Sequence, residues 1–367
     1  MVMAIPLFDI DTPRQRLRDR LVRAATQTVD EGRFILGPEV AAFEREFADY
    51  LGIEHVVGVA NGTDALTIAL RAMGVGPGDD VIVPAFTFYA SAEAIPPTGA
   101  RPVFCDIDPE TMMLTPETVH AALTPATKAV IAVHLFGNVA PIREIEALGV
   151  PVLEDTAQAA GSTGPDGRPG ALGTAATFSF FPSKNLGCLG DGGAIATSRQ
   201  EIADYARMLR FHGSRDQQTW ETIGYNSRLD EIQAAFLRVQ LPELDGWARG
   251  RCTAAANYER AGLGELVSLP TPTPGATAAW HLYVIRTDHV AAISAGLTAA
   301  DIGNRAYYTR PIHRHPAMAP YVAGVELPMT DALASTHLAI PMNPFLTEEQ
   351  AVEVTRCVER SLEQRAA

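Results

Sequence analysis

Short apolar runs that alternate with helical patterns dominate the first two hundred residues of the chain. The runs are apolar along their whole length, and most of them precede a segment with helical periodicity. Strands of this kind are typical of parallel sheets that helices cover on both faces. The pattern therefore predicts an α/β fold with a mostly parallel, seven-stranded sheet. The predicted strands are residues 55–60, 81–84, 101–107, 128–134, 150–155, 176–181 and 193–197.

The pattern changes after Trp247. A Pro-rich connection lies at 270–275 and an alternating strand at 281–287, and mixed helices and strands continue toward the C-terminus. A chain of 367 residues is too long for one small core. We therefore predict a large α/β domain at 1–247, with an N-terminal helical segment, and a smaller α+β domain at 248–367.

The charge balance limits the class of partner. With 43 acidic and 29 basic residues, the net charge of −14 argues against nucleic acid and anionic membranes, which need a basic surface. The four cysteines are widely spaced, so neither a metal site nor a disulfide framework is expected. Asp9 interrupts the N-terminal apolar residues, and no run of 18 apolar residues occurs. We therefore expect no signal peptide, no membrane span and a cytoplasmic location.

Lysine is rare in this chain. Only Lys128 and Lys184 occur, and the other basic residues are arginines. An arginine does not lose its proton in a protein, whereas a lysine can, and it then becomes a nucleophile. Lys184, which lies among small and apolar residues, is therefore a candidate for covalent chemistry. The alternative is a surface lysine that escaped a bias toward arginine.

Three further candidates follow predicted strands, where ligands collect in parallel α/β sheets. Gly62 and Thr63 come between a strand and a helix, where backbone amides can bind a phosphate, although Thr63 could simply cap the helix. Asp155 ends another strand, and its alternative role is to cap the next segment. Ser179 lies on the strand before Lys184, so a reversing loop would bring their side chains to one ligand.

A phosphate cradle, an acid and an amine together fit pyridoxal 5′-phosphate (PLP). Its aldehyde needs an amine, its phosphate needs amide donors, and its ring nitrogen needs an acid that keeps it protonated. Phe88 follows the strand at 81–84 and could stack on the ring, or it could belong to the core.

The motifs around these residues resemble those of the DegT/DnrJ/EryC1/StrS sugar aminotransferases, which are fold type I PLP enzymes. The resemblance covers nearly the whole chain, and its specificity comes from the order and spacing of the motifs. They include NGTDALTIAL, PAFTFYASAEAI, LEDTAQAAG, SFFPSKNLG, GYNSRLDEIQAA, WHLYVI and RPIHRHPAM.

The resemblance implies a role for each matching residue. Lys184 would bind the PLP aldehyde, Asp155 would pair with the ring nitrogen, and Gln158 would lie near the ring oxygen. The other cofactor contacts that it implies are Gly62, Thr63 and Ser179 at the phosphate and Phe88 on the ring.

Asn226, which is also the predicted N-cap of a helix at 226–244, would reach the phosphate in a neighbouring subunit. This implies a homodimer with shared active sites. Arg228, Tyr308 and His313 would bind substrate, with a salt bridge as the alternative for Arg228 and packing for the other two. His281 is expected to be structural.

The implied reaction transfers an amino group from an amino acid, usually L-glutamate, to a keto carbon of a nucleotide-linked, dTDP-type 3-keto or 4-keto-6-deoxyhexose. The segment RFILGPEV resembles the members that act at C3. Antibiotic or surface-glycan biosynthesis would suit such an enzyme. The alternatives are a cyclitol ketone as acceptor, a PLP-dependent sugar dehydratase, in which a histidine replaces the lysine, and a binding protein on an inactive scaffold. A nicotinamide dehydrogenase is disfavoured, because no GxGxxG motif follows a predicted strand.

Overall fold

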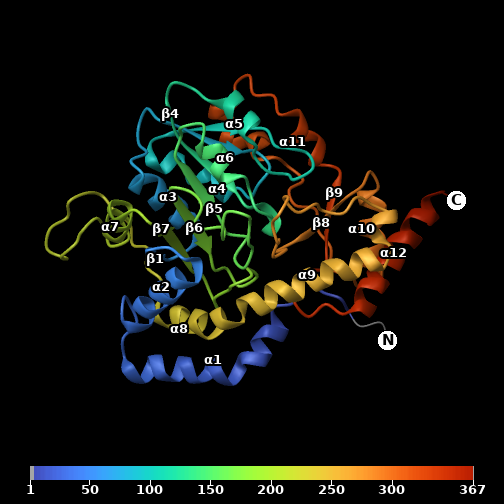
Figure 1. Ribbon diagram of the computed structural model, residues 1–367, viewed down its shortest axis with the longest axis horizontal. Coiled ribbons are helices and arrows are strands. Elements are labelled where there is room, and N and C mark those ends of the chain that lie inside the picture. The colour runs from blue at the N-terminus through green and yellow to red at the C-terminus, as the bar shows by residue number, and fades with distance from the viewer. Residues whose placement is uncertain (1–3, 367) are drawn as a thin grey trace.

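The computed structural model describes residues 4–366, and its largest feature is a seven-stranded sheet (Figure 1). Its strands lie in the order β1-β7-β6-β5-β4-β2-β3. The neighbouring pairs from β6 to β3 are parallel, whereas β7 is antiparallel to both β6 and β1. The prediction of a mostly parallel sheet is therefore confirmed. The strands are β1 (His55–Val59), β2 (Asp80–Pro84), β3 (Arg101–Cys105), β4 (Thr127–Val133), β5 (Val152–Asp155), β6 (Ala175–Ser179) and β7 (Gly193–Thr197).

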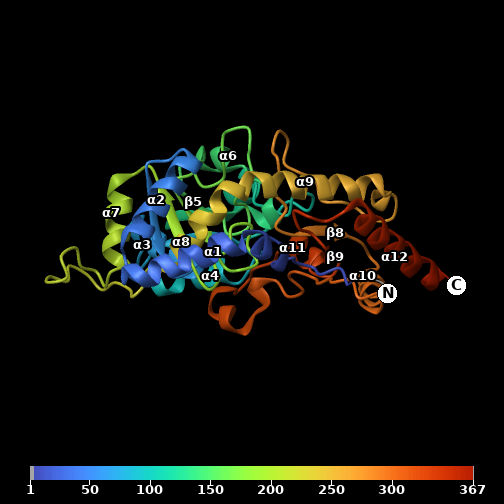
Figure 2. The same ribbon diagram turned by 90° about the horizontal axis from the view of Figure 1, so that it is seen from below.

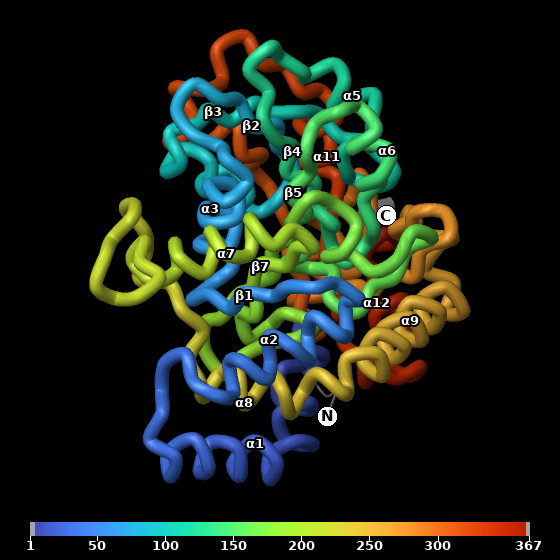
Figure 3. The backbone as a smooth tube through the Cα atoms, turned by 60° about the vertical axis from the view of Figure 1, so that its left-hand side comes forward, coloured from blue at the N-terminus to red at the C-terminus, as the bar shows by residue number. Residues whose placement is uncertain are grey.

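Helices cover both faces of the sheet, which explains why its strands are apolar throughout. On one face, α3 (Gly62–Ala72) and α7 (Gln200–Leu209) pack into the main core; on the other, α2 (Pro38–Leu51) and α8 (Glu231–Gln240) pack against β6 and β7. The helix α1 (Asp11–Glu31) packs on the side of α8 that faces away from the sheet (Figure 3). The shorter helices of this part are α4 (Ala90–Glu93), α5 (Pro116–Ala122) and α6 (Ile142–Glu146).

A second hydrophobic core forms around the antiparallel pair β8 (Tyr283–Arg286) and β9 (His337–Ile340). The helices α9 (Leu244–Arg260), α10 (Val290–Ala299) and α12 (Glu348–Ala366) contribute to it and lie together at one end of the molecule (Figure 2). The helix α11 (Pro328–Leu333) packs instead into the core of the large sheet. Because α9 is continuous through residues 247 and 248, the predicted domain boundary falls inside a helix, and the division there stays a prediction.

The helix predicted at 226–244 starts later and is interrupted. Asn226 forms an antiparallel bridge with Phe211, and α8 begins only at Glu231. The next residue, Ser227, is held on both sides, because its amide donates to the Arg210 carbonyl and its hydroxyl accepts from the Ala60 amide. These tertiary bonds keep the segment extended and override its capping propensity.

Within residues 4–366, none of the helices combines the length and the apolar character that crossing a membrane requires.

Candidate active site

A cavity of about 820 Å³ opens where β2, β4, β5 and β6 end. Its size is in the range of small-molecule and cofactor sites. It collects residues that are far apart in sequence. Eight of the predicted site residues line it, namely Gly62, Thr63, Phe88, Asp155, Gln158, Ser179, Lys184 and Tyr308.

Lys184 lies in the loop that follows β6, and its amide donates to the Phe181 carbonyl at 2.8 Å. Burial lowers the pKa of its amine to about 8, and the charge of Asp155 opposes part of this shift. A lysine with this pKa is neutral, and thus nucleophilic, in a far larger fraction of molecules near neutral pH than an ordinary lysine.

The residue after Lys184 ties its loop to the C-terminal part of the chain. Asn185 donates its side-chain amide to the carbonyls of Ala160 and Ala279, both at 3.1 Å. The carbonyl of the next residue, Trp280, accepts from the buried guanidinium of Arg251 at 3.0 Å. The loop that carries Lys184 is thus anchored, through Asn185, to residues on both sides of it in sequence.

Asp155 is the last residue of β5 and is buried. One carboxylate oxygen accepts a hydrogen bond from the Ser91 hydroxyl at 2.7 Å, and the other accepts from the Ala157 amide at 3.2 Å. The bond from Ala157 closes a local turn, which is the capping role considered as an alternative. Because Asp155 also lines the cavity, its carboxylate can serve a ligand at the same time.

The N-terminus of α3 meets Ser179 at one end of the cavity. Asn61 caps α3 by accepting a hydrogen bond from the Asp64 amide at 2.8 Å, so the cap is not Thr63. A Cβ atom added to Gly62 would lie 2.7 Å from the Cβ of Ser179, so only glycine fits there. This close approach places the first amides of α3 at the same end of the cavity as two hydroxyl residues, Thr63 and Ser179, and such a donor set suits a phosphate.

Gln158 and Tyr308 form a hydrogen-bonded pair in the wall of the cavity. The Gln158 side chain donates to the Tyr308 hydroxyl at 3.1 Å and accepts from the Phe136 amide at 2.8 Å. Burial raises the pKa of Tyr308, which keeps its hydroxyl protonated. Phe88 is 55% exposed, and its ring centroid lies 6.3 Å from that of Tyr308.

Three predicted residues lie outside this cavity. Asn226 is exposed and accepts a hydrogen bond from Arg228, whose guanidinium lies 5.5 Å from the centroid of the Phe211 ring. His313 is buried beside Phe104, with its Nε2 3.3 Å from a carboxylate oxygen of Asp331. None of the three therefore contacts the cavity within its own chain.

Two further residues lie at the site that were not predicted as site residues. His281 lines the cavity and stacks on Phe8, and burial, together with the charge of Lys184, lowers its pKa well below the usual value. His281 belongs to the WHLYVI motif and was expected to be structural; its contact with the cavity could not be read locally, because it arrives from the C-terminal part of the chain. Ser91 could have been considered from the sequence, because it and Thr87 are hydroxyl residues four positions apart that follow the predicted strand at 81–84.

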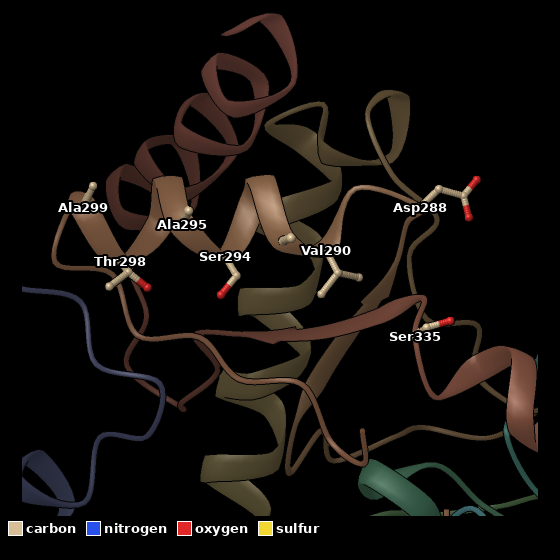
Figure 4. Close-up of a pocket in the computed structure, with 8 residues that line it drawn as sticks. Asp288, Val290, Ser294, Ala295, Thr298, Ala299 and Ser335 are labelled. Atoms are coloured by element: carbon tan, nitrogen blue, oxygen red, sulfur yellow. The ribbon is translucent and has the colours of Figure 1, made fainter. Parts of the chain in front are cut away.

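A second, open pocket lies on the surface of α10 (Figure 4). It is lined mainly by small side chains, and Asp288 is its one charged residue. Among residues 4–366, no group of three or more His, Cys, Asp or Glu side chains is arranged to hold a metal ion. The cavity around Lys184 is therefore the candidate active site.

A model of the DegT/DnrJ/EryC1/StrS aminotransferase family matches residues 15–359. The chain belongs to this family. It is 41% identical to dTDP-3-amino-3,4,6-trideoxy-α-D-glucose transaminase of Streptomyces venezuelae, with 96% of this chain and 95% of that protein covered. It is 43% identical to a protein of Geobacillus stearothermophilus named "Pleiotropic regulatory protein", with coverage of 95% and 96%. A solved Bacillus subtilis relative with bound PMP, the amino form of PLP, has a TM-score of 0.90 at 27% identity and covers 99% of this chain and 86% of its own.

The cofactor of this family of aminotransferases is PLP, as the sequence predicted. The residues of the cavity fit it. Amides and hydroxyls meet at the end where Gly62 leaves no room for a side chain, a carboxylate lies in the wall, and a low-pKa amine is nearby. These groups match the phosphate, the ring nitrogen and the aldehyde in turn.

Proposed function

We propose that this aminotransferase moves an amino group from L-glutamate to the keto carbon of a dTDP-linked 3-keto- or 4-keto-6-deoxyhexose. The observation that carries the proposal is that Lys184, Asp155 and the N-terminus of α3 share one cavity. The name of the Streptomyces relative, at 41% identity, supports a dTDP-linked sugar as the acceptor.

In this proposal the phosphate is held by Gly62, Thr63 and Ser179, and Asp155 keeps the proton on the ring nitrogen. Phe88 covers the ring, and Gln158 binds its oxygen. When bound, PLP supplies an electron sink that labilises the α-proton of the amino donor.

Lys184 has the central task. Its amine would hold the PLP aldehyde and would be free for proton transfer once an amino donor occupies the site. Because burial lowers the pKa of Lys184 to about 8, the free amine would be able to accept the α-proton of the donor and to give it back. The same amine would serve the keto sugar in the opposite direction. Tyr308, which is half-buried, would stay protonated and could donate a hydrogen bond to a sugar oxygen.

We also propose that a second copy of the chain completes each site. Asn226 and Arg228 would then reach the phosphate and the substrate of the partner. The loop between α7 and α8, which projects from the body (Figure 1), carries Trp220 and Ile223 with 63% and 85% exposure. Large apolar side chains that are exposed together mark interaction surfaces. His313 is assigned to substrate binding on the resemblance alone.

The keto position is proposed from one segment near the N-terminus. The RFILGPEV segment, whose resemblance favours C3, does not line the cavity of its own chain, and Gly37 there packs against the Glu231 carboxylate. A cyclitol ketone remains the alternative acceptor, whereas the presence of Lys184 disfavours the dehydratase. The decisive experiment incubates the amino form of the enzyme with dTDP-linked 3-keto and 4-keto sugars and a keto-inositol. Amination of a dTDP sugar supports the proposal, and amination of the keto-inositol alone overturns it.

A further inference from the structure

Ser91 is a buried serine on the short helix α4, directly behind the cavity. It is only 1% exposed, and its hydroxyl lies 2.7 Å from a carboxylate oxygen of Asp155. A second hydroxyl, that of Thr87, lies 3.3 Å from the Ser91 oxygen. The chain thus places two hydroxyls in series at the acid of the site, and the outer one belongs to Thr87, which also lines the cavity.

The direction of this hydroxyl series follows from the proposed role of Asp155, which requires an ionised carboxylate. An ionised carboxylate can only accept hydrogen bonds, so Ser91 must donate its single hydroxyl proton to it. The Ser91 oxygen is then free to accept from Thr87. The order of donation is therefore Thr87 to Ser91 to Asp155, and it ends on a buried charge, where hydrogen bonds are strong.

The two bonds to Asp155 come from different parts of the fold. The Ala157 amide belongs to the turn directly after β5, whereas Ser91 belongs to α4, which follows β2. Two donors on two separate carboxylate oxygens fix the plane of the carboxylate as well as its position. Among the described residues, Ser91 is the side chain that donates a hydrogen bond to Asp155.

We infer that Ser91 is a positioning residue whose hydroxyl, oriented by Thr87, fixes the Asp155 carboxylate in the plane that serves the ring nitrogen of the cofactor. The inference rests on the proposed role of Asp155. It assigns a role in cofactor binding to Ser91, which contacts Asp155 but does not itself line the cavity.

The test compares PLP binding by the apo forms of full-length variants. The variants are Ser91→Ala, Ser91→Thr, Asp155→Ala and the double variant Ser91→Ala/Asp155→Ala. Ser361→Ala is the matched control, because Ser361 is also buried and donates to a carbonyl at 2.7 Å, but in α12. The readouts are the PLP dissociation constant, the visible circular dichroism of the bound cofactor, and the thermal unfolding of the apo form.

Ser91→Ala should weaken PLP binding roughly 10-fold, as expected for the loss of one hydrogen bond to a buried charge, and should change the visible circular dichroism. Ser91→Thr should restore both, and Ser361→Ala should change neither. In the Asp155→Ala background, Ser91→Ala should have no further effect, because the residue acts through Asp155. If Ser91→Ala lowers the stability of the apo form, Thr87→Val tests the same series without altering α4 and should weaken binding about threefold. Because Thr87 also lines the cavity, this loss counts for the inference only if it disappears in the Asp155→Ala background.

Two results would overturn the inference. One is a Ser91→Ala variant that binds PLP with wild-type affinity and wild-type dichroism. The other is an equal loss of affinity in the presence and in the absence of the Asp155 carboxylate. A different result, in which Asp155→Ala itself binds PLP normally, would instead refute the proposed role of Asp155, so the two failures are distinguishable.

Discussion

Gly62, the first residue of α3, lies against Ser179, the last residue of β6, so closely that an added Cβ atom would be 2.7 Å from the Cβ of Ser179. Gly62→Ala should therefore separate the two and weaken PLP binding about 10-fold or more. Pyridoxal, which lacks the phosphate, should bind both proteins alike. Gly76→Ala is the control, because a Cβ atom added to Gly76 would have no atom within 4 Å. Equal losses for PLP and pyridoxal in Gly62→Ala would place the phosphate elsewhere.

The pKa of Lys184 predicts how PLP uptake depends on pH. Because burial lowers this pKa to about 8, the rate of bond formation by the apo protein should rise with pH and level off above about 8. An ordinary lysine would give a rate that still rises near pH 10. Stopped-flow absorbance measures the rate. The Lys128→Arg variant leaves Lys184 as the one lysine and should behave like the wild type. A rate that keeps rising beyond about pH 9.5 would contradict the account.

The buried carboxylate of Glu154 should matter for stability. It accepts hydrogen bonds from the amides of Gly170, Leu172 and Gly173, each at 2.8 Å, and lies 2.9 Å from Nε2 of His134. Glu154→Gln replaces one carboxylate oxygen, which accepts hydrogen bonds, by an NH₂ group, which donates them. This group would face the backbone amides and His134, so the substitution should lower the free energy of unfolding by about 3 kcal/mol.

Urea denaturation of the apo form measures this free energy. Glu144→Gln, a change at an exposed position on α6, should alter it by less than about 0.5 kcal/mol. If Glu154→Gln lowers the free energy of unfolding no more than Glu144→Gln does, the buried carboxylate contributes little to stability.

Shared active sites can be tested by mixing inactive subunits. A dimer of one Lys184→Ala and one Asn226→Ala chain has one intact site, made by Lys184 of the second chain and Asn226 of the first. With random exchange, the mixture should regain about a quarter of the wild-type activity. An activity equal to the mean of the two unmixed variants would mean that each chain uses its own Asn226.

The sheet could be predicted from the sequence because its strands are buried on both faces and therefore appear as continuous apolar runs. Lys184 could be predicted because lysine is rare here, and Gly62 because a small residue precedes a helix. The start of α8 could not, since tertiary bonds to Ser227 keep that segment extended.

The surroundings of these residues were harder to predict. His281 reaches the cavity from the C-terminal part of the chain, and Ser91 reaches Asp155 from α4, which follows β2, a strand two places away from β5 in the sheet. Such contacts depend on how elements pack against each other, which local patterns do not encode.

The absorbance spectrum of the purified protein with PLP tests the central claim, that Lys184 and Asp155 form an aminotransferase site. The account predicts a band near ~420 nm that moves to ~330 nm when L-glutamate is added, and that reappears with an accepted keto sugar. Lys184→Ala should not complete this cycle. A wild-type protein that stays colourless with PLP, or whose band does not respond to any amino acid, would contradict the claim.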